Sequence, residues 1–343
     1  MDAQFQIVAD KVEQIDLKNE LVELEEGDVD LRKEGFQQLW DILRKRKAIW
    51  KQKSRSAWIK LGDQNMRYFH KIANRRKAHN SFSRLWSNGQ WVEDPDMVKA
   101  EVVNYFCKMF QEDAWNRSKP ANLGFQKISK DQKEWLERPF TIEEIEEGLK
   151  SYYGSQAPGL DGYNFNFLKL IWISVREDFV NFFREFHRNN KLVRRLNSSF
   201  LALIPKKLSP RELKDFRPIS LIGCMYKLLA KVLANRLNVV MPVIISEMQS
   251  AFVGGRQLVD SVLVLNEVVD EVRKRKQPAF VFKADFQKAY DCVNWSFLDS
   301  MMDMFGFGEK WRGWIKECLS IARLLVLVNG SPTVEFAMGK GLK

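Results

Sequence analysis

Phe280-Val-Phe-Lys-Ala-Asp-Phe-Gln-Lys-Ala-Tyr-Asp-Cys-Val-Asn-Trp295 is the stretch of this 343-residue chain that decides the assignment of its fold. Its apolar start predicts a buried strand that ends at Asp285, and Tyr290 follows five residues later. A strand end holds a carboxylate more rigidly than a loop does, and carboxylate oxygens are ligands that Mg²⁺ prefers. We therefore expect Asp285 to bind a metal ion; an exposed acid at a strand end is the alternative.

The composition is that of a folded protein with a basic surface. Hydrophobic residues make up 45% of the chain and aromatic residues 12%, which is enough for one large core or two smaller ones. The formal net charge of +11 favours a polyanionic partner, although such an excess can also be a solvated surface. The cysteines lie far apart and match neither a zinc motif nor a compact disulfide framework, so we expect reduced thiols: Cys107, Cys224, Cys292 and Cys318.

The sequence also bears on where the protein resides. Its first residues lack the basic and apolar segments of a secretory signal, and no apolar run reaches the roughly 20 residues that a membrane span needs. These features predict a soluble protein of the nucleus or the cytoplasm, without a membrane partner. They give no indication of protein partners or of the oligomeric state.

The charge changes sign within the first quarter of the chain. Residues 1–34 are rich in Asp and Glu on an apolar pattern that predicts an exposed helix. From Arg44 to Arg84, many cations and interleaved aromatic rings accompany a single acid, Asp63. Such a stretch can bind a phosphate backbone and stack on bases, or its rings can be buried helix faces with the cations on the solvent side. The candidate nucleic-acid contacts are Lys45, Arg46, Arg75 and Arg76.

Local patterns predict a mixed α+β fold. Asn88-Gly89 and Asn329-Gly330 each predict a tight turn between two short strands, and Phe200–Pro205 predicts a buried strand. Thr141, followed by two glutamates, predicts the start of a helix. Residues 111–139 have weak periodicity and are interpreted as a linker. Further helices are predicted at 94–110, 165–172, 225–240, 260–274, 295–305 and 309–319.

Several short motifs follow one another along the chain. They include Ser56-Ala-Trp-Ile-Lys-Leu-Gly-Asp63, Ala157-Pro-Gly-Leu-Asp-Gly162, Leu203-Ile-Pro-Lys206, Phe216-Arg-Pro-Ile-Ser-Leu221, Gln249-Ser-Ala-Phe-Val-Gly-Gly-Arg256, Lys283-Ala-Asp-Phe-Gln-Lys-Ala-Tyr-Asp291 and Val328-Asn-Gly330. Each motif alone is a weak signal, but their order and spacing together are specific. Taken together, residues 54–343 resemble the reverse transcriptase of LINE-type non-LTR retrotransposons, particularly those of plants.

The resemblance implies a right-hand polymerase, in which residues 141–277 would supply the fingers and residues 278–343 the partial palm. Ahead of these, the sequence pattern itself predicts a helix-rich N-terminal extension: an acidic and then basic helical segment at residues 1–60, and a basic and aromatic extension with a linker at 61–140. The implied activity is Mg²⁺-dependent transfer of a nucleotide from a dNTP to the 3′-hydroxyl of a DNA primer on an RNA template.

The resemblance also assigns roles within the Lys283–Asp291 motif. Asp285 matches the first metal-binding, catalytic aspartate. Tyr290 matches the aromatic residue that packs below the sugar and excludes a ribose 2′-hydroxyl; a core position is the alternative. Asp291 is interpreted as a helix cap in preference to a metal ligand.

Four further residues receive nucleotide or template roles by resemblance. Lys206 and Arg217 match fingers positions suited to gripping the triphosphate, since an ammonium and a guanidinium suit anionic oxygens. Gln249 and Arg256 match a segment near the template strand. Surface salt bridges are the alternative for the first pair, and loop capping is the alternative for the second.

The elements that would complete the polymerase are not found in this sequence. The Tyr-Xaa-Asp-Asp hairpin and the thumb would follow Lys343, so we expect a truncated domain that is inactive by itself. A non-catalytic RNA- or DNA-binding module built on residues 44–84 is a second hypothesis, and it predicts binding that weakens steeply with salt. A helical adaptor whose basic face meets an acidic protein is a third.

Overall fold

The computed structural model describes residues 2–21, 25–54, 70–72, 74–75, 81–82, 84–112, 124–154, 156–276, 278–284, 286 and 288–342. The chain divides into two compact units, residues 1–81 and 82–343. Two of the predicted site residues, Asp285 and Arg76, lie outside the described residues, as does the motif at 56–63. None of the described helices is long and apolar enough to cross a membrane.

The first unit contains a helical hairpin. Helix α1 (Asp2–Leu21) packs against α2 (Glu26–Ser54), so the predicted acidic helix is present but divided in two. Val12 is buried against α2 at Gly35. The two helices approach closely there, since a Cβ atom at Gly35 would lie 2.5 Å from Val12 Cγ2. Arg32 Nε also pairs with Asp16 Oδ1 across the hairpin at 2.6 Å.

The second unit is built around a mixed sheet of strand order β4-β3-β5-β6, with β7 also pairing with β5. Strand β3 (Ser198–Pro205) is antiparallel to β4 (Phe216–Ile222) and parallel to β5 (Arg323–Val328). The turn Asn329-Gly330 leads into β6 (Ser331–Pro332), and β7 (Phe336–Ala337) follows. The sheet thus joins strands from both sides of the boundary predicted at residues 277 and 278.

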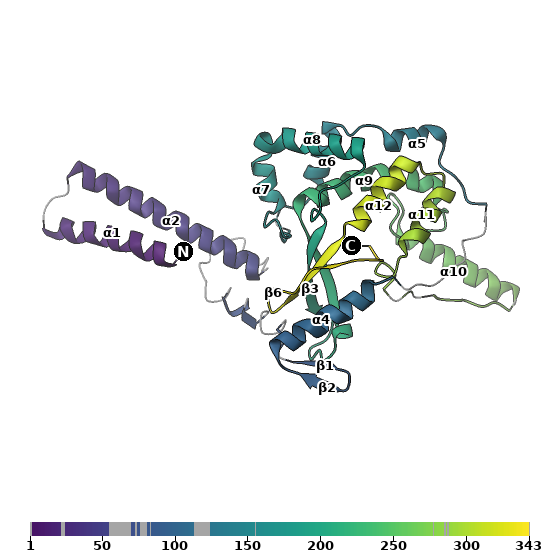
Figure 1. Ribbon diagram of the computed structural model, residues 1–343, viewed down its shortest axis with the longest axis horizontal. Helices are drawn as coiled ribbons and strands as arrows, with labels where there is room; N and C mark the ends of the chain where they lie inside the picture. Colours follow the sequence, from purple (N-terminus) through teal and green to yellow (C-terminus); the bar gives the residue numbers. More distant parts are fainter. Residues whose placement is uncertain are drawn as a thin grey trace. The chain divides into compact units, whose positions relative to one another are not determined.

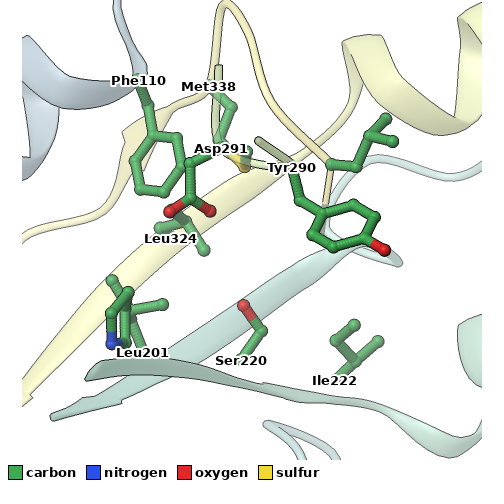
Figure 2. A pocket seen from close by; sticks show the side chains of 10 residues that line it. Phe110, Leu201, Ser220, Ile222, Tyr290, Asp291, Leu324 and Met338 are labelled. Carbon is green, nitrogen blue, oxygen red and sulfur yellow. The ribbon is translucent and has the colours of Figure 1, made fainter. Parts of the chain in front are cut away.

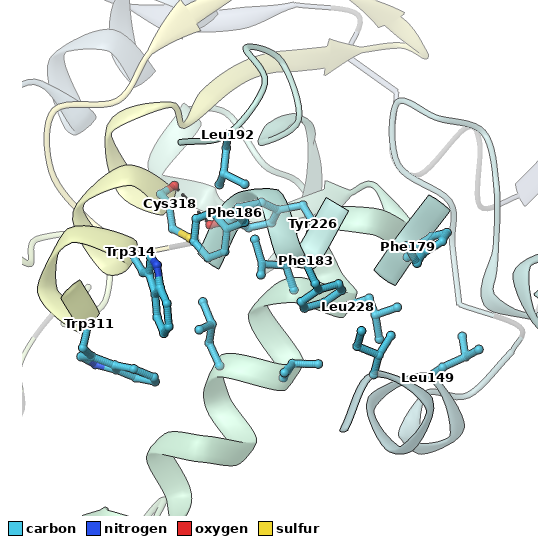
Figure 3. Close-up of a cluster of buried hydrophobic side chains, with 14 of the residues drawn as sticks. Leu149, Phe179, Phe183, Phe186, Leu192, Tyr226, Leu228, Trp311, Trp314 and Cys318 are labelled. Carbon is cyan, nitrogen blue, oxygen red and sulfur yellow. Dashed lines mark hydrogen bonds between the residues drawn. The ribbon is translucent and has the colours of Figure 1, made fainter. Parts of the chain in front are cut away.

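A cluster of helices forms the larger core of this unit, and both β3 and β5 follow directly from it along the chain. The Phe186 ring packs against the Trp314 ring with centroids 5.7 Å apart, and the Trp311 ring lies edge to face with Trp314 at 5.9 Å (Figure 3). The Tyr226 hydroxyl donates a hydrogen bond to the Cys318 carbonyl at 3.2 Å within this core. The helices are α5 (Lys130–Glu137), α6 (Ile142–Ser151), α7 (Phe165–Leu170), α8 (Trp172–Asn189), α9 (Cys224–Ile244) and α12 (Glu309–Ser320).

Local signals at the start of this cluster follow the sequence pattern in part. Thr141 caps α6 as predicted, and its hydroxyl and the Glu144 carboxylate form a reciprocal capping box. The stretch interpreted as a linker contains α5, whose start is capped in the same way by Ser129. The weak periodicity of 111–139 therefore concealed a short helix.

A buried guanidinium ties α9 to the segment between α5 and α6. Arg236, only 1% exposed, donates hydrogen bonds to the carbonyl oxygens of Leu136 and Arg138 at 2.8 and 2.6 Å and of Pro139 at 2.9 Å. It also forms two hydrogen bonds with the Glu144 carboxylate at 3.1 and 2.8 Å. Burial raises the pKa of Glu144, but the hydrogen bonds from Arg236 and the Thr141 N–H outweigh it, so the pKa is lowered.

A smaller core joins one face of the sheet to helix α4 (Pro95–Phe110), which lies against the strands (Figure 1). Strands β1 (Leu85–Ser87) and β2 (Gln90–Val92) form the predicted hairpin, with Asn88 and Gly89 both at positive φ. The Asn329 side chain completes this region, because it accepts a hydrogen bond from the Phe82 N–H at 2.7 Å and donates one to the Phe82 carbonyl at 2.8 Å.

The predicted strand that leads to Asp285 is wrong for the residues that the structure describes. Residues 278–284 have no strand partner there, and Phe280 and Phe282 are 100% and 91% exposed. Apolar character is necessary for a buried strand but insufficient, because a strand forms only where a neighbour receives its main-chain hydrogen bonds. The following helix, α11 (Trp295–Met304), is present as predicted.

Helix α10 (Leu258–Arg275) precedes this exposed segment and carries apolar residues at three- and four-residue steps. None of its described side chains is buried, and Val262 and Leu263 are among the exposed ones. The consecutive cations Arg273 to Lys276 separate these apolar residues from the exposed residues 278–284.

Candidate functional site

The cavity beside Tyr290 is the candidate functional site. It has a volume of about 410 Å³, and five of its ten lining residues come from the sheet. Pro218, Ser220 and Ile222 alternate along β4 and so share one face, and Leu201 lies opposite Ser220 in the register of β3 and β4. The remaining residues are Phe110, Tyr290, Asp291, Leu324, Met338 and Leu342.

The turn of residues 288–292 covers this face of the sheet. The Cys292 N–H donates to the Lys288 carbonyl at 3.1 Å, which closes the turn. Figure 2 shows the Asp291 carboxylate turned toward Leu324 and the Tyr290 ring beside it. The arrangement leaves room over the sheet between one aromatic ring and one carboxylate.

Asp291 is a site residue that the sequence interpretation missed. The helix cap assigned to it is wrong: Asn294 caps α11, since its side chain accepts the Phe297 N–H at 2.6 Å. The Asp291 carboxylate lines the cavity instead, and it makes no hydrogen bond with any part of the chain that the structure describes. Burial raises its pKa, and the nearby Lys288 ammonium lowers it in part. Its place next to Tyr290 in the motif was the available signal.

Residues 339–342 hold the Tyr290 turn in place from the other side. The Leu342 N–H donates to the Tyr290 carbonyl at 2.8 Å, and the Gly341 N–H donates to the Val293 carbonyl at 2.8 Å. The Trp295 indole N–H donates to the Gly341 carbonyl at 2.8 Å. Gly341 has a φ of +87°, and a Cβ atom there would lie 2.6 Å from the Asp291 carbonyl oxygen. Only glycine fits this close approach without strain.

The loop after α9 also reaches Tyr290. The rings of Phe252 and Tyr290 lie edge to face with centroids 6.3 Å apart. Arg256 donates hydrogen bonds to the carbonyls of Ile245, Ser246 and Gln249 at 3.1, 2.6 and 2.7 Å. Loop capping, the alternative weighed for Arg256, is therefore observed, and Gln249 donates to the Ala251 carbonyl at 3.2 Å in the same loop. Template contacts by these two residues stay a prediction.

The structure does not bring the two predicted triphosphate ligands into the cavity. Lys206 is exposed beyond the end of β3, and its ammonium donates to the Lys214 carbonyl at 2.9 Å. Arg217 lies opposite Ile204 in the sheet, and the alternation of side chains places it on the face away from Pro218 and Ser220. Arg217 is exposed and makes no ion pair within the described ranges, so surface salt bridging is not observed for it.

The four basic residues proposed for nucleic acid belong to the first unit. Lys45 is exposed on α2, and Arg46 beside it is half-buried. Arg75 is also exposed, and Arg76 lies outside the described residues. The described members of this set are therefore compatible with a solvent-facing basic surface.

The described side chains do not by themselves form a magnesium site. No group of three His, Cys, Asp or Glu residues in the described part of the chain is arranged to hold a metal ion. Asp291 offers one suitable oxygen donor at the cavity, but a single carboxylate does not enclose Mg²⁺.

Comparisons with known proteins support the resemblance seen in the motifs. Residues 204–343 match the model of a family described as "Reverse transcriptase (RNA-dependent DNA polymerase)". The chain is 28% identical over 284 residues to the "Transposon TX1 uncharacterized 149 kDa protein" of Xenopus laevis, which covers 82% of this chain and 22% of that protein.

Two further relatives come from insects. This chain is 26% identical to the "Probable RNA-directed DNA polymerase from transposon BS" of Drosophila melanogaster over 208 residues. The match covers 60% of this chain and 23% of that protein. The same share and identity hold for the "Retrovirus-related Pol polyprotein from type-1 retrotransposable element R2" of Popillia japonica, of which 28% is covered. The chain thus spans less than a third of each relative. The predicted resemblance to a non-LTR reverse transcriptase is confirmed, and its plant type stays a prediction: residues 204–343 match a reverse transcriptase domain, and the chain is similar to proteins of non-LTR retrotransposons.

Proposed function

We propose that this chain forms part of the nucleotide-binding surface of a reverse transcriptase that copies RNA into DNA. The observation that carries the proposal is the cavity between the Tyr290–Asp291 turn and the sheet, within the residues that match the reverse transcriptase family. In the proposed reaction a primer 3′-hydroxyl attacks the α-phosphate of a dNTP and pyrophosphate leaves. The similarity to a probable RNA-directed DNA polymerase of a transposon and to a Pol polyprotein of a retrotransposable element supports this assignment.

The sugar of the incoming nucleotide would lie in the cavity beside Tyr290. The ring flanks the space over Ile222, where a 2′-hydroxyl would add bulk next to an apolar surface without a partner. Neither Lys206 nor Arg217 lines the cavity, and Arg217 lies on the other face of the sheet, so their contacts with the triphosphate stay a prediction. The same proposal has three further parts. Residues 141–277 form the fingers and residues 278–343 the palm. Asp285 provides the Mg²⁺ requirement, and the origin is of the plant type.

The isolated chain is proposed to lack polymerase activity. Phe280, Phe282 and α10 expose apolar surface that a working palm would need to bury, because the carboxylate that follows must be held rigidly. Primer extension with an RNA template, dNTPs and Mg²⁺ tests this proposal. No extension is expected, and robust synthesis by the isolated chain would overturn the claim of inactivity.

Binding of a nucleotide is a separate experiment that does not require catalysis. Cys292 is the exposed member of the four cysteines and is adjacent to Asp291, so a fluorophore on its thiol reports on the cavity. Titration with a dNTP and Mg²⁺ is expected to change its emission with saturation. A Leu342→Glu variant places a negative charge at the cavity wall, where it repels the negatively charged triphosphate. This variant is expected to weaken the change in emission. An emission that no nucleotide changes would contradict the proposed site.

Nucleic-acid binding without catalysis is the second candidate, favoured by the exposure of Lys45 and Arg75. Replacement of Lys45, Arg46, Arg75 and Arg76 by Ala is expected to make the fall of log affinity with log salt concentration shallower. The slope should change by about 3 to 4, since each phosphate contact contributes about 0.7 to 0.9. An unchanged slope would exclude the patch as the contact. Binding of an acidic protein that nucleic acid does not displace would favour the adaptor hypothesis.

A further inference from the structure

An apolar stripe on α2 lacks a partner within the described first unit. Phe36, Trp40 and Leu43 are 40%, 53% and 41% exposed. Their spacing of four and three residues places them on one side of the helix, where they form a continuous ridge. The Arg32 guanidinium lies over the Phe36 ring at 5.2 Å and covers one end of it.

The hairpin that carries this stripe has a small core of its own. Val12 is the buried side chain among the described residues of α1 and α2; Phe5, Val8, Ile15, Val29 and Leu39 are half-buried, and ion pairs add to the hairpin. Two helices with so little buried apolar surface are marginal in water. A further helical surface laid on the stripe would add the missing core.

The distribution of charge along α2 indicates what that surface is. The N-terminal part, residues 26–34, has four acids against the cations Arg32 and Lys33, and ion pairs use both signs there: Asp28 with Lys18, Asp30 with Lys33 and Arg32 with Asp16. The charged residues of 44–53 are all cations, of which Arg44 pairs with Asp41: Arg44, Lys45, Arg46, Lys47, Lys51 and Lys53. A second α2 laid antiparallel brings each acidic end against a basic end, whereas a parallel copy brings like charges together.

We propose that two copies of this chain associate through the α2 stripe, antiparallel and with Trp40 near the two-fold axis. Each copy contributes the same surface, as in an isologous dimer, and the two hairpins together form a four-helix bundle. Trp40 is the central anchor, because large aromatic residues at the middle of an interface carry most of its binding energy. The proposal is independent of the nucleotide site.

Analytical ultracentrifugation of the full chain over a concentration series tests the association. A dimer is expected, and Trp40→Glu is expected to raise its dissociation constant by about 30-fold or more. Leu31→Glu is the matched control: Leu31 is 58% exposed on the same helix but on another side, and its replacement is expected to leave the dimer unchanged. Val262→Glu on α10 controls for association through the other apolar surface.

A distance measurement tests the orientation. Spin labels on Glu26→Cys in a Cys292→Ser background are expected about 40 Å apart, because Glu26 lies 14 positions before Trp40 and a helix rises about 1.5 Å per residue on each side of the axis. A distance near 10 Å would show a parallel pair and contradict the charge argument. A wild-type protein that is monomeric at all concentrations, or a dimer that Trp40→Glu leaves intact, would overturn the proposal. If Trp40→Glu lowers the melting temperature but leaves the measured mass unchanged, the stripe packs within a single chain, which also overturns the proposal.

Discussion

Asp215 fixes the turn that joins β3 to β4, and its replacement by Asn is a quantitative test of that role. Its carboxylate accepts hydrogen bonds from the N–H groups of Arg211 and Glu212 at 2.9 and 3.1 Å and pairs with the Lys207 ammonium at 2.9 Å. Its main-chain carbonyl accepts the Lys206 N–H at 2.8 Å. Asn keeps the shape of the side chain but removes the charge.

The expected loss of stability follows from the pKa of this carboxyl. Burial raises the pKa, but the hydrogen bonds from Arg211, Lys207 and Glu212 outweigh it and lower the pKa from 3.8 to about 2. That difference corresponds to about 2.5 kcal/mol if undiminished. Lys207 is largely exposed, so water screens the pair, and we expect Asp215→Asn to cost about 1 to 2 kcal/mol at pH 7.

The dependence on pH gives the test its sign. The folded-state pKa lies below the unfolded value, so the stabilisation is fully present above pH 4 and is lost as the pH falls toward about 2. Urea unfolding followed by tryptophan fluorescence at pH 7, 5, 4 and 3 measures the difference between the wild type and Asp215→Asn. The difference is expected to narrow below pH 4, and the exposed control Asp270→Asn is expected to change stability by less than about 0.5 kcal/mol. A constant difference at all four values, or none at pH 7, would refute the reasoning.

Three further substitutions probe other parts of the second unit. Arg236→Met leaves three carbonyls without their donor and removes one of the two guanidinium partners of the Glu144 carboxylate, the other being Arg138; it is expected to destabilise the protein by about 3 to 5 kcal/mol in urea unfolding, and a loss below about 1 kcal/mol would contradict the role of Arg236. Gly341→Ala forces a Cβ atom toward the Tyr290 turn and is expected to speed thiol labelling of Cys292, whereas an unchanged rate would show that the turn does not depend on this contact. Asn329→Ala removes two hydrogen bonds and is expected to cost about 1 to 3 kcal/mol by thermal unfolding; an unchanged melting temperature would count against this anchor.

Features with local causes could be predicted from the sequence. The turns at Asn88-Gly89 and Asn329-Gly330 both form, because Asn and Gly accept the positive φ values that such turns need. The start of α6 at Thr141 follows from a hydroxyl cap and an acid three residues later. Each signal lies within a few residues of the structure it determines.

Features that depend on distant partners could not be predicted in the same way. The apolar residues 280–282 suggested a strand, but a strand needs a neighbour, and β5 pairs with β3 across more than a hundred intervening residues. The capping role of Arg256 and the position of Asp291 in the cavity likewise depend on how separate loops meet. The family motifs contain residues of the candidate cavity, among them Tyr290 and Asp291, although they did not determine which side chains face it.

The preference for deoxynucleotides, measured with and without the Tyr290 ring, tests the central claim most directly. Dissociation constants for a dNTP and the matching rNTP would be measured from the emission of a fluorophore on Cys292, in the wild type and in Tyr290→Ala. We predict a preference for the deoxynucleotide of about tenfold or more in the wild type, equivalent to about 1.4 kcal/mol, and a ratio near one in Tyr290→Ala. An equal ratio in both proteins, or no nucleotide binding in either, would contradict the assignment of this cavity to the nucleotide sugar.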